Sequence, residues 1–154
     1  FPVDVGISEV RGIIEVVKDN GNSLSISKLS EEAEEEIDKL LPLIDACEML
    51  GLCTVENGMV KLTKTGIDLN MKNSSQIISK ALSGIEPFRS IKEALAGKAL
   101  TTSALASILK SKNIVLFADD TVNIEMLRNL LIKWGVRTKM LSYDRDEDKW
   151  SLTR

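Results

Sequence analysis

The dipeptide Asn57-Gly58 is the sequence feature that most constrains how this chain can fold. It stands between two short apolar runs, Leu52 to Val55 and Met59 to Leu62. Asn-Gly readily adopts the left-handed backbone that a tight turn between paired strands needs, so the pattern predicts a β-hairpin. A helical pattern ends just before the first run, and Gly51 supplies its C-terminal stop. The chain is therefore expected to pass from a helix directly into a hairpin.

Two more helices are predicted upstream of this hairpin. The first covers Ile7 to Val17, where apolar residues recur at the spacing of an amphipathic helix, and the polar run Asp19 to Asn22 ends it. A short segment, Leu24 to Ile26, then leads to Ser27, which we expect to cap a small second helix carrying Leu29 inward.

The helix that leads into the hairpin has the clearest apolar face, made by Ile37, Leu40, Leu41, Ile44 and Cys47. We expect Asp38 to cap this helix, so that Pro42 falls within the first turn, where a missing N–H is tolerated. After the hairpin, Thr63, Thr65 and Gly66 are expected to close it. Three helices followed by a hairpin is the element order of a winged helix.

The second half of the chain repeats this order loosely. Apolar stripes run from Ile77 to Ile85 and from Phe88 to Leu95, and Pro87 between them leaves either two helices or one kinked helix. A short helix is predicted over Ser103 to Lys110. The run Ile114 to Phe117 fits either a strand or a buried connection.

The last predicted helix has one apolar face, made by Ile124, Leu127, Leu131 and Trp134. Asp119 to Thr121 offers caps at its start, and Gly135 is expected to end it. Two strands, Arg137 to Tyr143 and Trp150 to Thr153, then flank an acidic turn from Asp144 to Asp148.

The sequence therefore predicts a mainly α fold with short β-hairpins, an α+β arrangement of two winged-helix-like units in tandem. The polar stretch Asn70 to Ser75 is the expected boundary, with residues 1–72 in the first unit and 73–154 in the second. A length of 154 residues suits one compact domain or two small ones, and a hydrophobic fraction of 44% is enough to build cores.

No apolar run approaches the roughly 20 residues of a membrane-spanning helix, and the start of the chain lacks the features of a signal peptide. We therefore expect a cytoplasmic protein without direct membrane insertion. The opening pair Phe1-Pro2, without a methionine, reads as the interior of a longer chain.

Histidine is absent from the whole sequence. This removes the commonest general base and the commonest metal ligand, so triads and dyads that need histidine cannot be built from this chain. The two cysteines, Cys47 and Cys53, do not have the close spacing of a redox or zinc pair, and we interpret them as buried, inert thiols.

Phosphate-binding and metal-binding motifs are also missing. The nearest candidate for a phosphate loop, Gly97-Lys98-Ala99, has no Ser or Thr after its lysine. The acidic runs Glu31 to Asp38 and Asp144 to Asp148 have no calcium-loop pattern, so we interpret them as a solvated face and a hairpin tip, although Asp-x-Asp spacing in the second leaves weak cation binding open. We predict a non-catalytic chain without a cofactor or metal.

The charge distribution separates the two halves and bears on DNA binding, the main rival function of a winged helix. Residues 1–75 hold 7 basic and 14 acidic residues, a net charge of −7, and the rest holds 13 basic and 9 acidic residues, a net charge of +4; together they give −3. Acids crowd the start of the third helix in the first half, where DNA would have to approach. The second half offers Arg128, Asn129 and Lys133 outward, but beside an acidic turn.

Three aromatic residues, Trp134, Tyr143 and Trp150, lie at the end of the last helix and on the hairpin after it. They could line a small-molecule pocket, but an anchor that holds the hairpin on the helix is the preferred interpretation.

The order of several segments resembles the AAA-associated C-terminal domain. The segments are Gly12 to Glu15, Leu40 to Ala46, Glu48 to Leu52, Val60 to Thr63 with Gly66, and Trp134-Gly135 followed by Tyr143-Asp144. The resemblance covers nearly the whole chain and is weakest from Lys98 to Val122. Its motifs are mostly structural, so no catalytic, cofactor or metal residue is carried over.

This resemblance implies a regulatory or assembly domain that follows the ATP-binding subunit of nitrate, sulfonate or taurine type ABC transporters. Its expected partner is the transporter ATPase, with a homodimer as a further possibility. A winged-helix transcription factor and a sensor domain for a small ligand remain as alternatives. A transcription factor would retain DNA in a salt-sensitive way, and a sensor domain would be stabilised against heat by its ligand.

Overall fold

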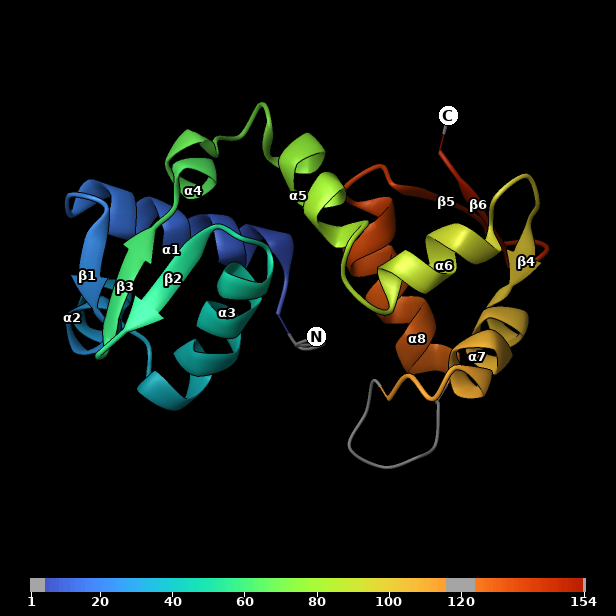
Figure 1. Ribbon diagram of the computed structural model, residues 1–154, viewed down its shortest axis with the longest axis horizontal. Coiled ribbons are helices and arrows are strands. Elements are labelled where there is room, and N and C mark those ends of the chain that lie inside the picture. The colour runs from blue at the N-terminus through green and yellow to red at the C-terminus, as the bar shows by residue number, and fades with distance from the viewer. Residues whose placement is uncertain (1–4, 116–123, 154) are drawn as a thin grey trace. The chain divides into compact units, whose positions relative to one another are not determined.

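The computed structural model describes residues 5–115 and 124–153, and its fold is mainly α with short β-hairpins, as the sequence predicts (Figure 1). Each hairpin is extended by a third strand, which was not predicted, into a small antiparallel sheet. The chain divides into two compact units, and the division between Ile77 and Ile78 lies within helix α5 (Ser74–Leu82). We call them the N-terminal unit and the C-terminal unit and describe each by itself.

The N-terminal unit consists, in chain order, of α1 (Ile7–Asp19), β1 (Ser23–Ser25), α2 (Ile26–Ala33), α3 (Ile37–Met49), β2 (Cys53–Glu56), β3 (Met59–Leu62) and α4 (Lys64–Asp68). Strand β3 lies between β1 and β2 and pairs antiparallel with both (Figure 1). Helices α1 and α3 pack against each other. The buried residues that these two helices contribute to the core are Val10, Ile13, Ile14, Val17, Leu40, Leu43, Ile44 and Cys47. The apolar face predicted for α1 is thereby confirmed. The face predicted for α3 is partly wrong, because Ile37 and Leu41 are exposed and Leu43 takes their place beside Leu40, Ile44 and Cys47 in the core.

The predicted hairpin is present in the N-terminal unit. Glu56 of β2 pairs with Met59 of β3, and the two residues between them, Asn57 and Gly58, have φ angles of 50° and 74°. Two successive left-handed residues give the tight turn whose twist matches that of the paired strands. Asn-Gly therefore forms the turn that the sequence predicted.

The starts of α2 and α3 differ from the sequence prediction. The side chain of Ser25, not Ser27, caps α2 by accepting a hydrogen bond from the N–H of Lys28 at 3.1 Å, because the strand β1 passes directly into the helix. Helix α3 begins after Glu36 rather than after Asp38, so Pro42 lies in its second turn. Pro42 is exposed, so water can replace the hydrogen bond that its missing N–H removes.

The segment after the hairpin contains a helix that was not expected. Thr63, which we took as part of the closing of the hairpin, is the N-cap of α4, and its hydroxyl accepts a hydrogen bond from the N–H of Gly66 at 3.1 Å. The same hydroxyl donates to the carbonyl of Gly51 at 2.6 Å. Thr63 thus ties the start of α4 to the end of the preceding helix.

The C-terminal unit repeats the order of strand, two helices and hairpin. Its elements after α5 are α6 (Phe88–Ala94), β4 (Leu100–Thr101), α7 (Thr102–Ser111), α8 (Ile124–Leu130), the π-helix η1 (Leu131–Val136), β5 (Leu141–Asp144) and β6 (Lys149–Leu152). Strand β6 lies between β4 and β5, as β3 does in the first sheet (Figure 1). The core is built from Phe88, Ile91, Leu105, Leu109, Leu127, Leu131, Trp134, Leu141 and Trp150. The winged-helix interpretation of both units stays a prediction.

Several predictions for the C-terminal unit are settled by these bounds. The stripes around Pro87 form two helices, and the predicted helix over Ser103 to Lys110 corresponds to α7. The strand expected from Arg137 begins only at Leu141. Ile114 and Val115 are in neither a helix nor a strand, whereas residues 116–117 and the expected caps 119–121 lie outside the described residues.

Gly135 does not end the last helix but lies inside η1. A Cβ at this position would stand 2.5 Å from Cδ1 of Leu141, so the glycine leaves room for the first residue of β5. Strand β5 begins later than predicted because η1 continues past Gly135 to Val136. A turn follows, in which Lys139 has a φ of 63°.

Candidate functional site

The outer face of α3, the third helix of the N-terminal unit, combines apolar and acidic side chains. Ile37, Leu41 and Met49 are 43%, 42% and 44% exposed. Asp45 and Glu48 are exposed on the same helix. Residues four apart lie one above the other on a helix, so Ile37 and Leu41 are neighbours on this face and Asp45 separates them from Met49.

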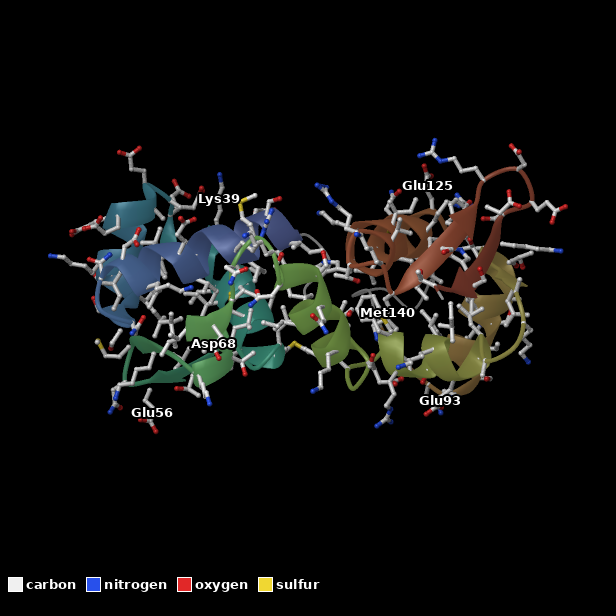
Figure 2. The ribbon with its side chains drawn as sticks, turned by 90° about the horizontal axis from the view of Figure 1, so that it is seen from above. Lys39, Glu56, Asp68, Glu93, Glu125 and Met140 are labelled. Atoms are coloured by element: carbon white, nitrogen blue, oxygen red, sulfur yellow. The ribbon has the colours of Figure 1, made fainter. Side chains whose placement is uncertain are left out.

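Lys39 is the one basic residue of α3, and it is partly neutralised. Its Nζ lies 3.7 Å from Oε1 of Glu35 in an exposed ion pair, and the side chain extends from the surface of the unit (Figure 2). In a winged helix that binds DNA, the third helix needs basic side chains for the phosphates. The exposed face of α3 has the opposite character.

A groove with a volume of about 750 Å³ lies between the N-terminal parts of α1 and α3. Its lining residues are Val5, Glu9, Gly12, Ile13, Val16, Ala33, Glu35, Asp38, Lys39, Leu40, Pro42 and Leu43. The lining is mainly apolar, and the charged residues are three acids and one lysine. Among the acids, Glu9 also accepts a hydrogen bond from the N–H of Gly6 at 3.1 Å, which fixes the start of α1. Sequence reasoning did not find this groove.

Gly12 lies in the interior of α1 and in the lining of the groove. It is exposed, and no heavy atom lies within 4 Å of the position that a Cβ would take. A glycine inside a helix costs about 0.8–1.0 kcal/mol relative to alanine. The packing of the N-terminal unit therefore gives no reason for a glycine here.

The C-terminal unit contains a second polar arrangement, which we call the Asp148 cluster: Thr102, Arg128, Tyr143, Asp148 and Trp150. Oδ1 of Asp148 accepts hydrogen bonds from the hydroxyl groups of Tyr143 at 2.5 Å and Thr102 at 2.8 Å. Nε of Arg128 lies 3.3 Å from the same oxygen, and its Nη2 lies 3.5 Å from Oδ2. Nε1 of Trp150 donates to the hydroxyl of Thr102 at 2.8 Å. The cluster joins the hairpin to α7 and α8.

The charge of Asp148 is stabilised by these partners. The hydrogen bond from Tyr143 is the largest cause that holds the pKa of Asp148 below its ordinary value, and Thr102 and Arg128 act in the same direction. The same hydrogen bond raises the pKa of Tyr143, since ionised Tyr143 could no longer donate. The pKa of Arg128 is also raised, mainly by its hydrogen bond to Asp148.

Acid should weaken the C-terminal unit through Asp148. Because the pKa of Asp148 is lower in the folded chain than its ordinary value of 3.8, the ionised side chain stabilises the fold above that value and loses this effect as the pH falls through the folded pKa. We expect Asp148→Asn to cost about 1 kcal/mol at pH 7, and the difference from wild type to vanish in strong acid. Urea unfolding followed by tryptophan fluorescence measures it, because both tryptophans lie in this unit.

Asp146→Asn is the matched control, because Asp146 is exposed in the same turn and its removal changes the net charge equally. An equal, pH-independent effect of the two substitutions would contradict the structural role of the Asp148 cluster.

The residues that were expected to point outward toward DNA differ in their exposure. Arg128 is half-buried and pairs with Asp148, whereas Asn129 is exposed. Lys133 is half-buried on η1. The contact between Asp148 and Arg128 was not predicted, because the acidic run Asp144 to Asp148 was interpreted as a hairpin tip.

The aromatic residues have the anchoring role that was preferred for them. Trp134 and Trp150 are completely buried, and the ring of Tyr143 stacks on Trp150 with 4.2 Å between the ring centroids. Packing therefore accounts for the two tryptophans. Tyr143 also lines an open pocket of about 420 Å³ together with Arg128, Ile132, Arg145 and Asp148.

The two cysteines are free and buried, as expected. Burial raises the pKa of Cys53 to about 12 and that of Cys47 further, so neither thiol ionises near neutral pH. Within residues 5–115 and 124–153, no group of three or more His, Cys, Asp or Glu side chains could hold a metal ion. None of the helices in these same ranges is long and apolar enough to cross a membrane.

Comparison with known families gives one match. The family model described as C-terminal AAA-associated domain matches residues 27–144, which is well over half of the chain. No curated protein and no solved structure matches. The match begins within α2 and ends at the last residue of β5. It therefore covers α3 and, of the Asp148 cluster, Thr102, Arg128 and Tyr143 but not Asp148 or Trp150.

Proposed function

Because the chain belongs to the family of C-terminal AAA-associated domains, we propose that it is a non-catalytic accessory domain that binds an ATPase through α3 and regulates or assembles it. In this proposal the ATPase is the ATP-binding subunit of an ABC transporter of the nitrate, sulfonate or taurine type, and the domain acts on the cytoplasmic side of the membrane.

The exposed face of α3 is the observation that carries the proposal. Interfaces between proteins have apolar centres with a polar rim, and the neighbouring side chains of Ile37 and Leu41, with Asp45 next to them, have that composition. Burying Ile37 and Leu41 against a partner would remove apolar surface that the unit itself leaves in water. The bordering acids would orient a partner with a basic surface.

DNA binding has less support. The third helix of the N-terminal unit is acidic, and in the C-terminal unit the guanidinium of Arg128 is bound to Asp148. Both features oppose contact with phosphates.

The proposal is tested by binding of this chain to the ATPase expressed separately, measured by fluorescence anisotropy. We expect Leu41→Asp to weaken binding at least about tenfold, which corresponds to about 1.4 kcal/mol, because it places a charge in the apolar centre of the interface. Ile67→Asp is the matched control, since Ile67 is also 42% exposed but lies on α4.

Two results would overturn the proposal. One is the absence of binding between the wild-type chain and the ATPase, and the other is hydrolysis of ATP by the chain alone. If Leu41→Asp and Ile67→Asp lost equal affinity for the ATPase, the proposal that α3 makes the contact would be wrong. Salt-sensitive retention of a DNA duplex would support the transcription factor instead.

A further inference from the structure

We propose that the groove between α1 and α3 receives an amphipathic helix of the partner, with apolar side chains in the groove and basic side chains over its acidic rim. This inference rests on the proposed function and adds a second contact with the same partner, because Ile37, Leu41 and Met49 do not line the groove.

The walls of the groove suit a helix. They are provided by the N-terminal halves of α1 and α3, and their apolar members include Val16, Leu40 and Pro42. Two neighbouring helices leave a furrow into which the side-chain ridge of a third helix can pack. Short amphipathic helices are commonly recognised in this way, through apolar residues that recur along one face.

Gly12 shows where the partner would approach most closely. It lies in the lining of the groove, is exposed, and has open space where its Cβ would be. A glycine in a helix interior is destabilising, and its structural use is to let another backbone come near. Since no described part of the N-terminal unit uses this space, we take a docked helix as its occupant.

The charges around the groove select a basic helix. Glu9, Glu35 and Asp38 line it, and the opposing charge of Lys39 is engaged by Glu35. Four more acids border this region at the end of α2 and in the loop before α3, and all are exposed: Glu31, Glu32, Glu34 and Glu36. Lysine or arginine on the partner would be attracted to this rim, whereas an acidic helix or a nucleic acid would be repelled.

The experiment uses a synthetic amphipathic peptide of roughly 18 residues, about five helical turns, with leucine on one face and lysine on the other. Its binding to the full chain is measured by fluorescence anisotropy at low and physiological salt, next to a peptide with glutamate in place of lysine. We expect the lysine peptide to bind more tightly than the glutamate peptide. We also expect Gly12→Leu to weaken its binding at least about tenfold, because the added side chain fills the groove.

Three variants control this result. Ser8→Leu adds the same side chain at an exposed position of α1 outside the groove lining and should leave binding unchanged. Gly12→Ala adds one carbon and should retain most of the binding. Asp38→Asn removes a rim charge without adding bulk and should weaken binding of the lysine peptide only, more at low salt than at high salt.

The inference is wrong if the wild-type chain does not prefer the lysine peptide, or if Gly12→Leu and Ser8→Leu bind it equally. Testing Gly12→Leu against the ATPase separates the two proposals. If Gly12→Leu bound the ATPase as wild type does, the proposal that the groove binds a helix of the partner would be overturned while the proposed function stands. If the wild-type chain did not bind the ATPase, the proposed function itself would be overturned. Concentration-dependent self-association that Gly12→Leu abolishes would assign the groove to a second copy of the chain and overturn the partner helix.

Discussion

Gly66→Ala is expected to destabilise the N-terminal unit by about 3 kcal/mol or more, a large part of the stability of a small unit. A Cβ on Gly66 would lie 2.0 Å from the carbonyl oxygen of Leu52 and 3.0 Å from its carbonyl carbon. Both are backbone atoms and cannot turn aside as the end of a side chain could. The carbonyl of Leu52 also accepts a hydrogen bond from the N–H of Thr63 at 3.0 Å, so its withdrawal would break the link between β2 and α4.

Thermal unfolding followed by far-UV circular dichroism measures this loss, because the N-terminal unit contains neither of the two tryptophans. Gly12→Ala is the matched control, since it makes the same chemical change in a helix of the same unit where the Cβ meets nothing within 4 Å. It should stabilise the unit by about 0.5–1 kcal/mol. If both variants melted alike, the close approach of α4 to Leu52 would be contradicted.

The parts of the fold that could be predicted from the sequence depend on contacts between neighbours in the chain. The Asn57-Gly58 turn is specified by the backbone preferences of two adjacent residues. The buried residues of α1 repeat at the helical period, so a pattern a few residues long reveals them. The same pattern revealed α3 but placed Ile37 and Leu41 on its buried face, although both are exposed.

Helix starts were harder to predict, because several residues near each start could serve as the cap. Ser25 and Ser27 are equally good caps by residue type, and the pairing of β1 with the distant strand β3 decides in favour of Ser25. Asp38 is likewise a better cap by residue type than Glu36, yet α3 begins after Glu36, without a hydrogen bond from its side chain. Long-range packing therefore decides what the local sequence leaves open.

The candidate sites could not be predicted because they also depend on contacts between residues far apart in the sequence. Thr102 and Asp148 are 46 positions apart, and nothing in the local sequence distinguishes Asp148 from the other acids of its turn. The groove between α1 and α3 needs both helices in place, although Gly12 within an amphipathic pattern was a signal that could have directed attention to it. The acidic character of the exposed face of α3 could be predicted in part, because the acidic residues at the start of this helix disfavour DNA binding.

Trp150→Ala is expected to destabilise the C-terminal unit by about 3–5 kcal/mol. Trp150 is completely buried on β6, the central strand of its sheet, and its ring stacks on Tyr143. Removing it leaves a large cavity and deprives the hydroxyl of Thr102 of its donor. Urea unfolding followed by the fluorescence of Trp134, which remains in the same unit, measures the change. A loss below about 1 kcal/mol would contradict the anchoring role of this tryptophan.

The hydrogen bond of Trp150 can be separated from its bulk by a double-mutant cycle of Trp150→Phe and Thr102→Val. Thr102→Val leaves the buried indole N–H without its partner, which costs about 1–3 kcal/mol, and it also removes a donor to Asp148. Trp150→Phe removes the N–H itself, so the double variant should be more stable than the sum of the two single losses predicts, by about 1 kcal/mol. Simple additivity would mean that bulk alone makes Trp150 an anchor and that the link from Trp150 through Thr102 to Asp148 contributes no stability.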